Sequence, residues 1–187
     1  EAARRNLRST LNLLLGVLET ERAGGDAAYF VRADTNRIRL AGTDRLDVDV
    51  WRFDELLDEA ERLEADGAPT LALDRLLEGT ALYRGDLLSG IQEGEWLHIE
   101  RQRLHVRFVA AAVRTAELLL AHDRIDEAIA LASRTITVEP WSEPAHSLLV
   151  AAHLQRGDRA AARRAMQHCH DVLDELAAFE AAREEQY

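Results

Sequence analysis

Arginine and asparagine side chains near the start of the chain have the types and spacing that recognition of DNA uses. Arg4, Arg5, Arg8 and Asn12 fall in one short segment. Arginine pairs with phosphates and with guanine edges, and asparagine pairs with adenine edges. These four residues are therefore candidate DNA contacts. The alternative is a solvated helix face, because all 23 basic residues are Arg, a bias that a GC-rich coding sequence also produces.

A second group of arginines flanks a predicted turn. Two short β-prone runs, 29–32 and 37–40, are separated by Ala-Asp-Thr-Asn, a connection of hairpin length. Arg32, Arg37 and Arg39 would lie on this hairpin and are candidate contacts to the DNA backbone. Charges on a strand face are also common where no ligand binds.

The remaining polar residues do not form a recognisable catalytic or metal site. His98 and His105 are seven residues apart, and His168 and His170 are two apart, unlike the i, i+4 pair of a helical zinc site. Cys169 falls at an apolar repeat position, which favours packing over nucleophilic chemistry. Since the sequence also has no glycine-rich phosphate loop and no nucleophile elbow, we expect no enzyme activity, no cofactor and no metal.

Charge divides the 187 residues into two parts. Residues 1–48 hold eight Arg and seven acids, or +1, whereas residues 49–187 hold 15 Arg and 27 acids, or −12. This asymmetry indicates different partners for the two parts. The apolar runs are far shorter than the ~20 residues that span a bilayer. A single Cys excludes an internal disulfide. We therefore expect a cytoplasmic protein without a membrane span.

Periodicity predicts a mainly α fold around these residues. Leu7, Leu11, Leu14 and Leu18 form an apolar stripe on a helix over about 3–21, ahead of the hairpin. Six further helices are expected, with caps and breakers at their ends. They span about 49–66, 69–83, 95–122, 125–138, 143–156 and 159–182.

The last third of the chain contains an internal repeat. A shift of 34 residues superposes small or apolar positions, among them Ala128 on Ala162 and Leu131 on Ala165. This period, with two helices per unit, is typical of tetratricopeptide-type arrays. The helix over 95–122 has two apolar faces and is expected to be buried on two sides. Trp51, Trp96 and Trp141 are interpreted as packing anchors, with an exposed interface role for one of them as the alternative.

Four motifs in order resemble a known family. They are Leu46-Asp-Val-Asp-Val-Trp-Arg-Phe53, Ala81-Leu-Tyr-Arg-Gly-Asp-Leu-Leu88, Trp96 with Glu100-Arg-Gln-Arg-Leu104, and Val138-Glu-Pro-Trp-Ser-Glu-Pro-Ala-His146. Over about residues 46–176 they are similar to the bacterial transcriptional activator domain of SARP-type regulators. The resemblance implies a helical-repeat module of a DNA-binding transcriptional activator.

The segment before this module resembles the second half of an OmpR-type winged helix, in which a recognition helix is followed by a two-stranded wing. The resemblance implies a partial winged helix over 1–45 and a helical activator domain over 46–187. The implied partners are promoter DNA, bound through the complete winged helix, and the transcription machinery or another protein. We also expect a weak homodimer. The alternative function is a protein-binding or signal-sensing scaffold that makes no DNA contact through this chain.

Overall fold

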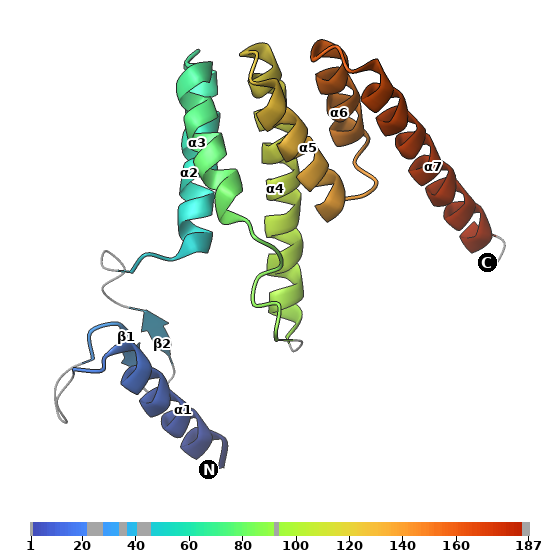
Figure 1. Ribbon diagram of the computed structural model, residues 1–187. Coiled ribbons are helices and arrows are strands. Elements are labelled where there is room, and N and C mark those ends of the chain that lie inside the picture. Colours follow the sequence, from blue (N-terminus) through green and yellow to red (C-terminus); the bar gives the residue numbers. More distant parts are fainter. Residues whose placement is uncertain (1, 22–27, 34–36, 41–45, 92–93, 185–187) are drawn as a thin grey trace. The chain divides into compact units, whose positions relative to one another are not determined.

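The chain divides into two compact units, Glu1–Val48 and Asp49–Tyr187. A computed structural model describes residues 2–21, 28–33, 37–40, 46–91 and 94–184 (Figure 1). The described part is mainly helical, as the sequence predicts. No described helix combines the length and apolar character needed to cross a membrane.

The first unit contains one helix and one hairpin. Helix α1 spans Ala2–Leu18, and the strands β1, Val31–Ala33, and β2, Ile38–Leu40, pair antiparallel. Two features connect helix and hairpin: Val31 is buried, and Glu19 Oε1 accepts a hydrogen bond of 2.7 Å from the Phe30 N–H. The leucine stripe of α1 remains largely uncovered, with Leu7, Leu14 and Leu18 all exposed.

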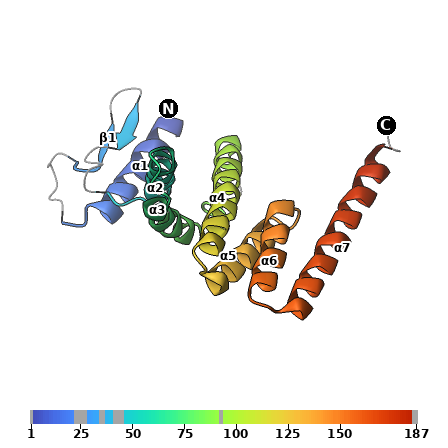
Figure 2. The same ribbon diagram turned by 90° about the horizontal axis from the view of Figure 1, so that it is seen from above.

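The second unit is an array of six helices that pack on their neighbours in sequence (Figures 1 and 2). Their bounds agree closely with the predicted ranges. They are α2 Asp49–Ala65, α3 Pro69–Leu82, α4 Glu95–Ala121, α5 Ile125–Val138, α6 Glu143–Gln155 and α7 Arg159–Glu184. Three antiparallel pairs result, α2 with α3, α4 with α5 and α6 with α7, so that α2, α4 and α6 all run in the same direction.

Local sequence explains where these helices begin and end. Pro69 occupies the first turn of α3, where its missing N–H costs nothing. Gly67 has a φ of +74°, a left-handed conformation that suits glycine after the end of α2. Asp158 precedes α7, and its Oδ1 accepts a hydrogen bond of 2.9 Å from the Ala161 N–H, which caps the helix.

The core of the array is built on α4. Phe108 is fully buried; it stacks on Tyr83 with 4.3 Å between ring centroids, and the Arg134 guanidinium lies 4.9 Å from its centroid. Ala128 and Ala162, the repeat-related alanines, are both buried where helices meet. Small residues at these positions let helix pairs approach closely, which is the role predicted for them.

Two expectations about burial are wrong. Helix α4 buries one predicted face, but Ile99 and Val106 on the other face are 58% and 59% exposed. Val109 and Leu120 of that face are partly buried against the core, so only its N-terminal part is uncovered, because the shorter helix α5 packs against the C-terminal part of α4. In the repeat, Met166 is exposed although its counterpart Ala132 is buried, because α7 is the last helix of the array and packs mainly on α6.

Candidate functional site

Helix α1 displays the polar residues predicted to contact DNA. Arg5, Arg8 and Asn12 are all exposed and, at i, i+3 and i+7, share one helix face. Arg4 also belongs to α1, but its side chain is outside the described part of the chain. The structure therefore brings three of the four predicted residues of this group onto one surface.

The hairpin carries a second basic surface. Arg32 on β1 is directly opposite Arg39 on β2, and opposite residues of an antiparallel pair share a face. Arg37, just before β2, is exposed as well. No hydrogen bond or ion pair joins these three arginines to any other described residue. Like charges placed opposite each other are destabilising, so an anion bound between Arg32 and Arg39 would relieve their repulsion.

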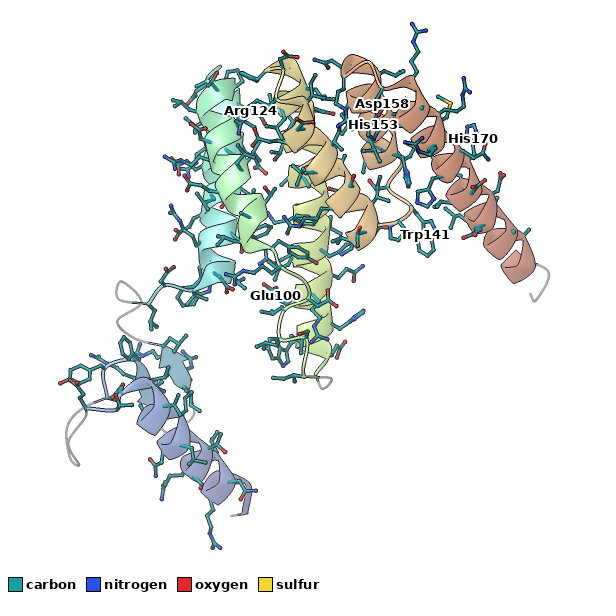
Figure 3. All side chains as sticks on the ribbon, in the orientation of Figure 1. Glu100, Arg124, Trp141, His153, Asp158 and His170 are labelled. Atoms are coloured by element: carbon teal, nitrogen blue, oxygen red, sulfur yellow. The ribbon has the colours of Figure 1, made fainter. Side chains whose placement is uncertain are left out.

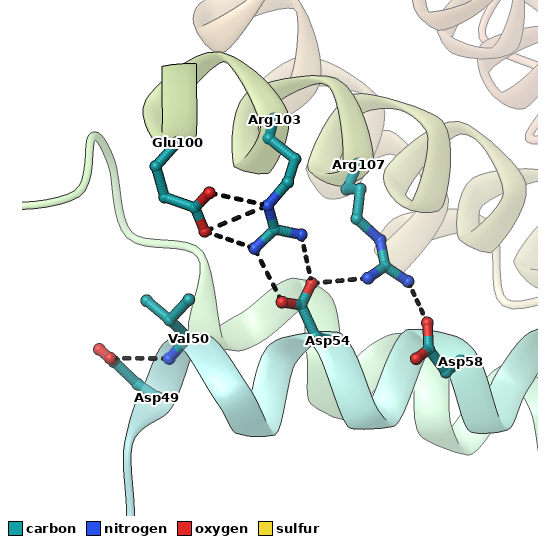
Figure 4. Close-up of polar contacts among 7 residues, drawn as sticks. All are labelled: Asp49, Val50, Asp54, Asp58, Glu100, Arg103 and Arg107. Carbon is teal, nitrogen blue, oxygen red and sulfur yellow. Dashed lines mark hydrogen bonds and ion pairs between the residues drawn. The ribbon is translucent and has the colours of Figure 1, made fainter. Parts of the chain in front are cut away.

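Several arginines of the second unit, in contrast, form ion pairs within the fold, and Figure 4 shows two of them, Arg103 and Arg107. Arg103 on α4 bonds both carboxylate oxygens of Asp54 on α2, at 2.9 and 2.8 Å. Arg107, one turn later, bonds Asp54 at 2.6 Å and Asp58 at 2.5 Å. Glu100 bonds Arg103 from the same helix, and Arg114 bonds Glu64 further along. We call this series from Glu100 to Glu64 the ionic ladder.

The ladder changes the proton affinities of its members. Burial raises the pKa of the Asp54 carboxyl, but hydrogen bonds and charge from Arg103 and then Arg107 outweigh it and hold this pKa below its usual value. The hydrogen bond from Arg103 also lowers the pKa of Glu100. The carboxyls of Asp54 and Glu100 are therefore charged at neutral pH, and the ladder joins α2 to α4 along one side of the array.

Arg101 organises the connection between α3 and α4. Its guanidinium donates to the carbonyl oxygens of Leu87, Leu88 and Ile91 at 2.6–2.8 Å. Beside this loop is an open pocket of about 580 Å³. Its lining is mostly apolar, with Asp49, Arg84 and Asp86 at its edge. These side chains do not form an acid-base pair or a nucleophile with its base, so the pocket has no evident catalytic chemistry.

The histidine and cysteine residues behave as structural side chains. His105 Nε2 contacts Glu139 Oε2 at 2.9 Å, and the buried His146 contacts the Pro140 carbonyl at 2.8 Å through Nε2. Cys169 is only partly buried, and burial, then the charge of Glu143, raises the pKa of its thiol, which opposes nucleophilic reactivity. Among the described residues, no cluster of three or more His, Cys, Asp or Glu could hold a metal ion.

All three tryptophans are on the surface, which corrects their interpretation as packing anchors. Trp51, Trp96 and Trp141 are 40%, 61% and 55% exposed. Each stands at or just before the start of the first helix of a pair, where the next helix pair does not cover it. The sequence contains a signal for this placement: an acidic residue of the first helical turn, Asp49, Glu95 or Glu143, accompanies each indole.

Comparisons with known proteins show which family and which known structure the chain is similar to. The family model described as "Bacterial transcriptional activator domain" matches residues 48–184. The chain is similar in structure to the C-terminal TPR-containing domain of an FK506-binding protein of Plasmodium falciparum, with a TM-score of 0.51 and 12% identity over 74% of this chain and 94% of that one. This likeness confirms the predicted tetratricopeptide-like fold. No curated protein matches the sequence.

Proposed function

The chain belongs to the bacterial transcriptional activator domain family, and we propose that it is the regulatory and interaction module of a cytoplasmic DNA-binding transcriptional activator. Residues 49–187 contact the transcription machinery or another protein. The observation that carries this proposal is the family match over a tetratricopeptide-like array, an architecture that offers extended binding surfaces to partners. No catalytic step is assigned to it.

Residues 1–48 supply the DNA contact in this proposal. Helix α1 acts as the recognition helix of a winged helix and presents Arg5, Arg8 and Asn12, together with Arg4, to the major groove. The hairpin acts as the wing and brings Arg32 and Arg37 to the phosphate backbone. Support comes from the exposure of the described side chains and from the Arg32–Arg39 pair, which favours a bound anion. A weak homodimer aligns two such modules on adjacent sites.

Tethering tests the activating role. The full chain is fused to an unrelated DNA-binding domain whose operator lies upstream of a reporter gene in a bacterial host. We expect higher reporter transcription than with the DNA-binding domain alone, because the array recruits its protein partner to the promoter. Equal transcription with both proteins, at equal protein levels, would contradict the role.

A salt series of binding measurements tests the DNA contact. The full chain and a labelled duplex are titrated at about 50 to 200 mM salt, alongside the variant Arg32→Ser/Arg37→Ser/Arg39→Ser. The matched control is Arg159→Ser/Arg163→Ser/Arg164→Ser, three exposed arginines of α7. If the hairpin contacts phosphates, the hairpin variant binds more weakly. The slope of its log binding constant against log salt concentration becomes shallower by roughly 0.9 per lost contact. The control should keep the slope of the parent chain.

The alternative function, a protein-binding or signal-sensing scaffold without DNA contact, makes the opposite prediction. The charge of −12 on residues 49–187 favours it, since a surface of this charge repels phosphates. Equal DNA affinity of the parent chain and both triple variants would support this alternative.

A further inference from the structure

The three exposed tryptophans follow the repeat of the array. Trp51, Trp96 and Trp141 are 45 residues apart in sequence, one for each helix pair. Because α2, α4 and α6 run in the same direction, the indoles fall at the same end of their helix pairs. Figure 3 shows Trp141 at the turn that leads into α6, beside the first half of α4 and not at its start. We call these three residues the tryptophan row.

An apolar stripe extends the row along α4. Ile99 follows Trp96 by one turn, and Val106 lies two turns further along the face of Ile99. Both side chains are more than half exposed. Tryptophan gives the largest free-energy gain of any side chain when a partner covers it, and it is enriched at binding hot spots. Its repeated exposure beside an apolar stripe indicates a contact surface.

The charges beside the row select the partner. Asp49, Glu95 and Glu143 accompany the three indoles in the first helical turns. Of the arginines nearby, Arg101 bonds loop carbonyls and Arg103 bonds Asp54 and Glu100, while Arg52, next to Trp51, pairs with Glu55 and Glu78. The surface therefore offers indole faces and carboxylates, a combination that binds guanidinium and ammonium groups through cation–π contacts and ion pairs.

We propose that the tryptophan row, with Ile99 and Val106, is the docking surface for a basic amphipathic segment of a protein partner, in which Arg or Lys alternates with apolar residues. This inference rests on the proposed protein-contact function and names its surface and partner chemistry. Charge argues against a second copy of the array as occupant, because each array brings −12.

The indoles supply a direct probe of the surface. The chain has only three Trp, and all belong to the row, so its intrinsic tryptophan fluorescence reports on this surface alone. Synthetic peptides of equal length with alternating Leu/Arg, Leu/Gln or Leu/Glu patterns are titrated into the full chain at about 150 mM salt. We expect a blue-shifted emission only with the Leu/Arg peptide, since that peptide alone desolvates the indoles and pairs with the carboxylates.

Point variants test whether the tryptophan row itself binds the peptide or whether the negative charge of the array alone attracts it. Affinity for a labelled Leu/Arg peptide is measured by anisotropy for Trp96→Ser, for the conservative Trp96→Phe, and for Leu154→Ser, a matched exposed apolar residue of α6. We expect about a tenfold loss with Trp96→Ser, partial recovery with Trp96→Phe and no change with Leu154→Ser. Equal affinity of all variants, equal binding of the Leu/Gln peptide, or a dimer in light scattering that the variant Trp96→Ser converts to a monomer would each overturn the proposal.

The tethered reporter distinguishes failure of the tryptophan row as the contact surface from failure of the proposed function. Loss of activation in Trp96→Ser but not in Leu154→Ser supports the row as the contact that activates transcription. Unchanged activation in the combined variant Trp51→Ser/Trp96→Ser/Trp141→Ser overturns the row as that contact, while the proposed function stands. If the parent chain itself does not activate, the proposed function fails, and the peptide measurements still decide whether the row binds basic segments.

Discussion

Many arginines of the second unit are bonded within the fold, whereas the arginines of the first unit whose side chains the structure describes are not; Arg84, Arg159, Arg163 and Arg164 of the second unit are exposed as well. In residues 49–187, Arg103 and Arg107 bond carboxylates of the neighbouring helix, and Arg101 and Arg134 bond backbone carbonyls. In the described part of residues 1–48, Arg5, Arg8, Arg32, Arg37 and Arg39 are exposed and have no such bonds. An Arg-only composition therefore says little by itself, and the distinction between structural and available arginines comes from the fold.

Apolar side chains differ between the units in the same way. Phe108 and Leu119 are fully buried within the helical array, whereas Leu7, Leu13 and Val17 of α1 are at least half exposed. The array therefore has an apolar core of its own, although it also exposes Trp96, Ile99 and Val106, whereas the described part of residues 1–48 leaves most of its leucines exposed. The difference predicts that the array supplies most of the stability of the chain.

The largest effect should come from Phe108→Ala in the array. This change removes a fully buried ring together with its stack on Tyr83 and its contact with Arg134, and should cost roughly 3 to 5 kcal/mol of unfolding free energy. Urea unfolding of the full chain, followed by circular dichroism, measures it. Val106→Ala, an exposed residue of the same helix, is the control and should change little. Similar losses of unfolding free energy for both variants would contradict the assignment of Phe108 to the core and of Val106 to the surface.

Asp54→Asn should have the next largest effect, because it removes the carboxylate shared by Arg103 and Arg107. Hydrogen bonds to charged groups contribute about 1.5 to 3 kcal/mol, and a loss in this range is expected. Since folding lowers the pKa of Asp54, its stabilisation is present above about pH 4 and is lost as pH falls through the folded value. Unfolding curves between neutral and acidic pH should therefore be less pH-dependent in the variant.

Ala162→Leu tests the close approach of α7 to α6. The larger side chain should overpack a buried alanine position and cost roughly 1 to 3 kcal/mol. Arg163→Leu, the same new residue at the adjacent exposed site, serves as the control and should be near neutral. An unchanged melting temperature in Ala162→Leu would show that the repeat register is wrong.

The smallest effect is expected from Leu14→Ser in α1. Leu14 is exposed, so its replacement should change the free energy of unfolding by no more than about 0.5 kcal/mol. Thermal unfolding of the full chain, compared with Leu119→Ser in the array, measures the contrast. A large loss with Leu14→Ser would mean that the leucine stripe is covered in solution, and the difference between the units would disappear.

Helix positions were predictable because their determinants are local. Periodic apolar residues define each helix, and Gly67 and Pro69 mark an end and a beginning by their backbone preferences alone. The 34-residue repeat correctly predicted that Ala128 and Ala162 are buried, because small residues are favoured where helices pack closely. The pairing of β1 with β2 likewise followed from alternating β-prone runs around a turn.

Exposure of whole faces was not predictable from the same information. The face of α4 that carries Ile99 and Val106 has the apolar periodicity of a buried face along its whole length, but it is open at these two residues and partly buried at Val109 and Leu120. The partners of Arg103 and Arg107 are about 50 residues away in sequence, so local patterns do not distinguish these arginines from the unbonded Arg5. Whether Arg4, Arg5, Arg8, Asn12, Arg32 and Arg37 contact DNA stays a prediction.

The ionic ladder has a mechanical consequence for the array. It connects α2 to α4 along one side only, while the apolar core holds α2 and α4 to α3 on the other. Partly exposed ion pairs weaken as salt screens them, whereas apolar contacts do not. Rising ionic strength should therefore weaken the link between α2 and α4 more than it weakens the apolar contacts of these two helices with α3.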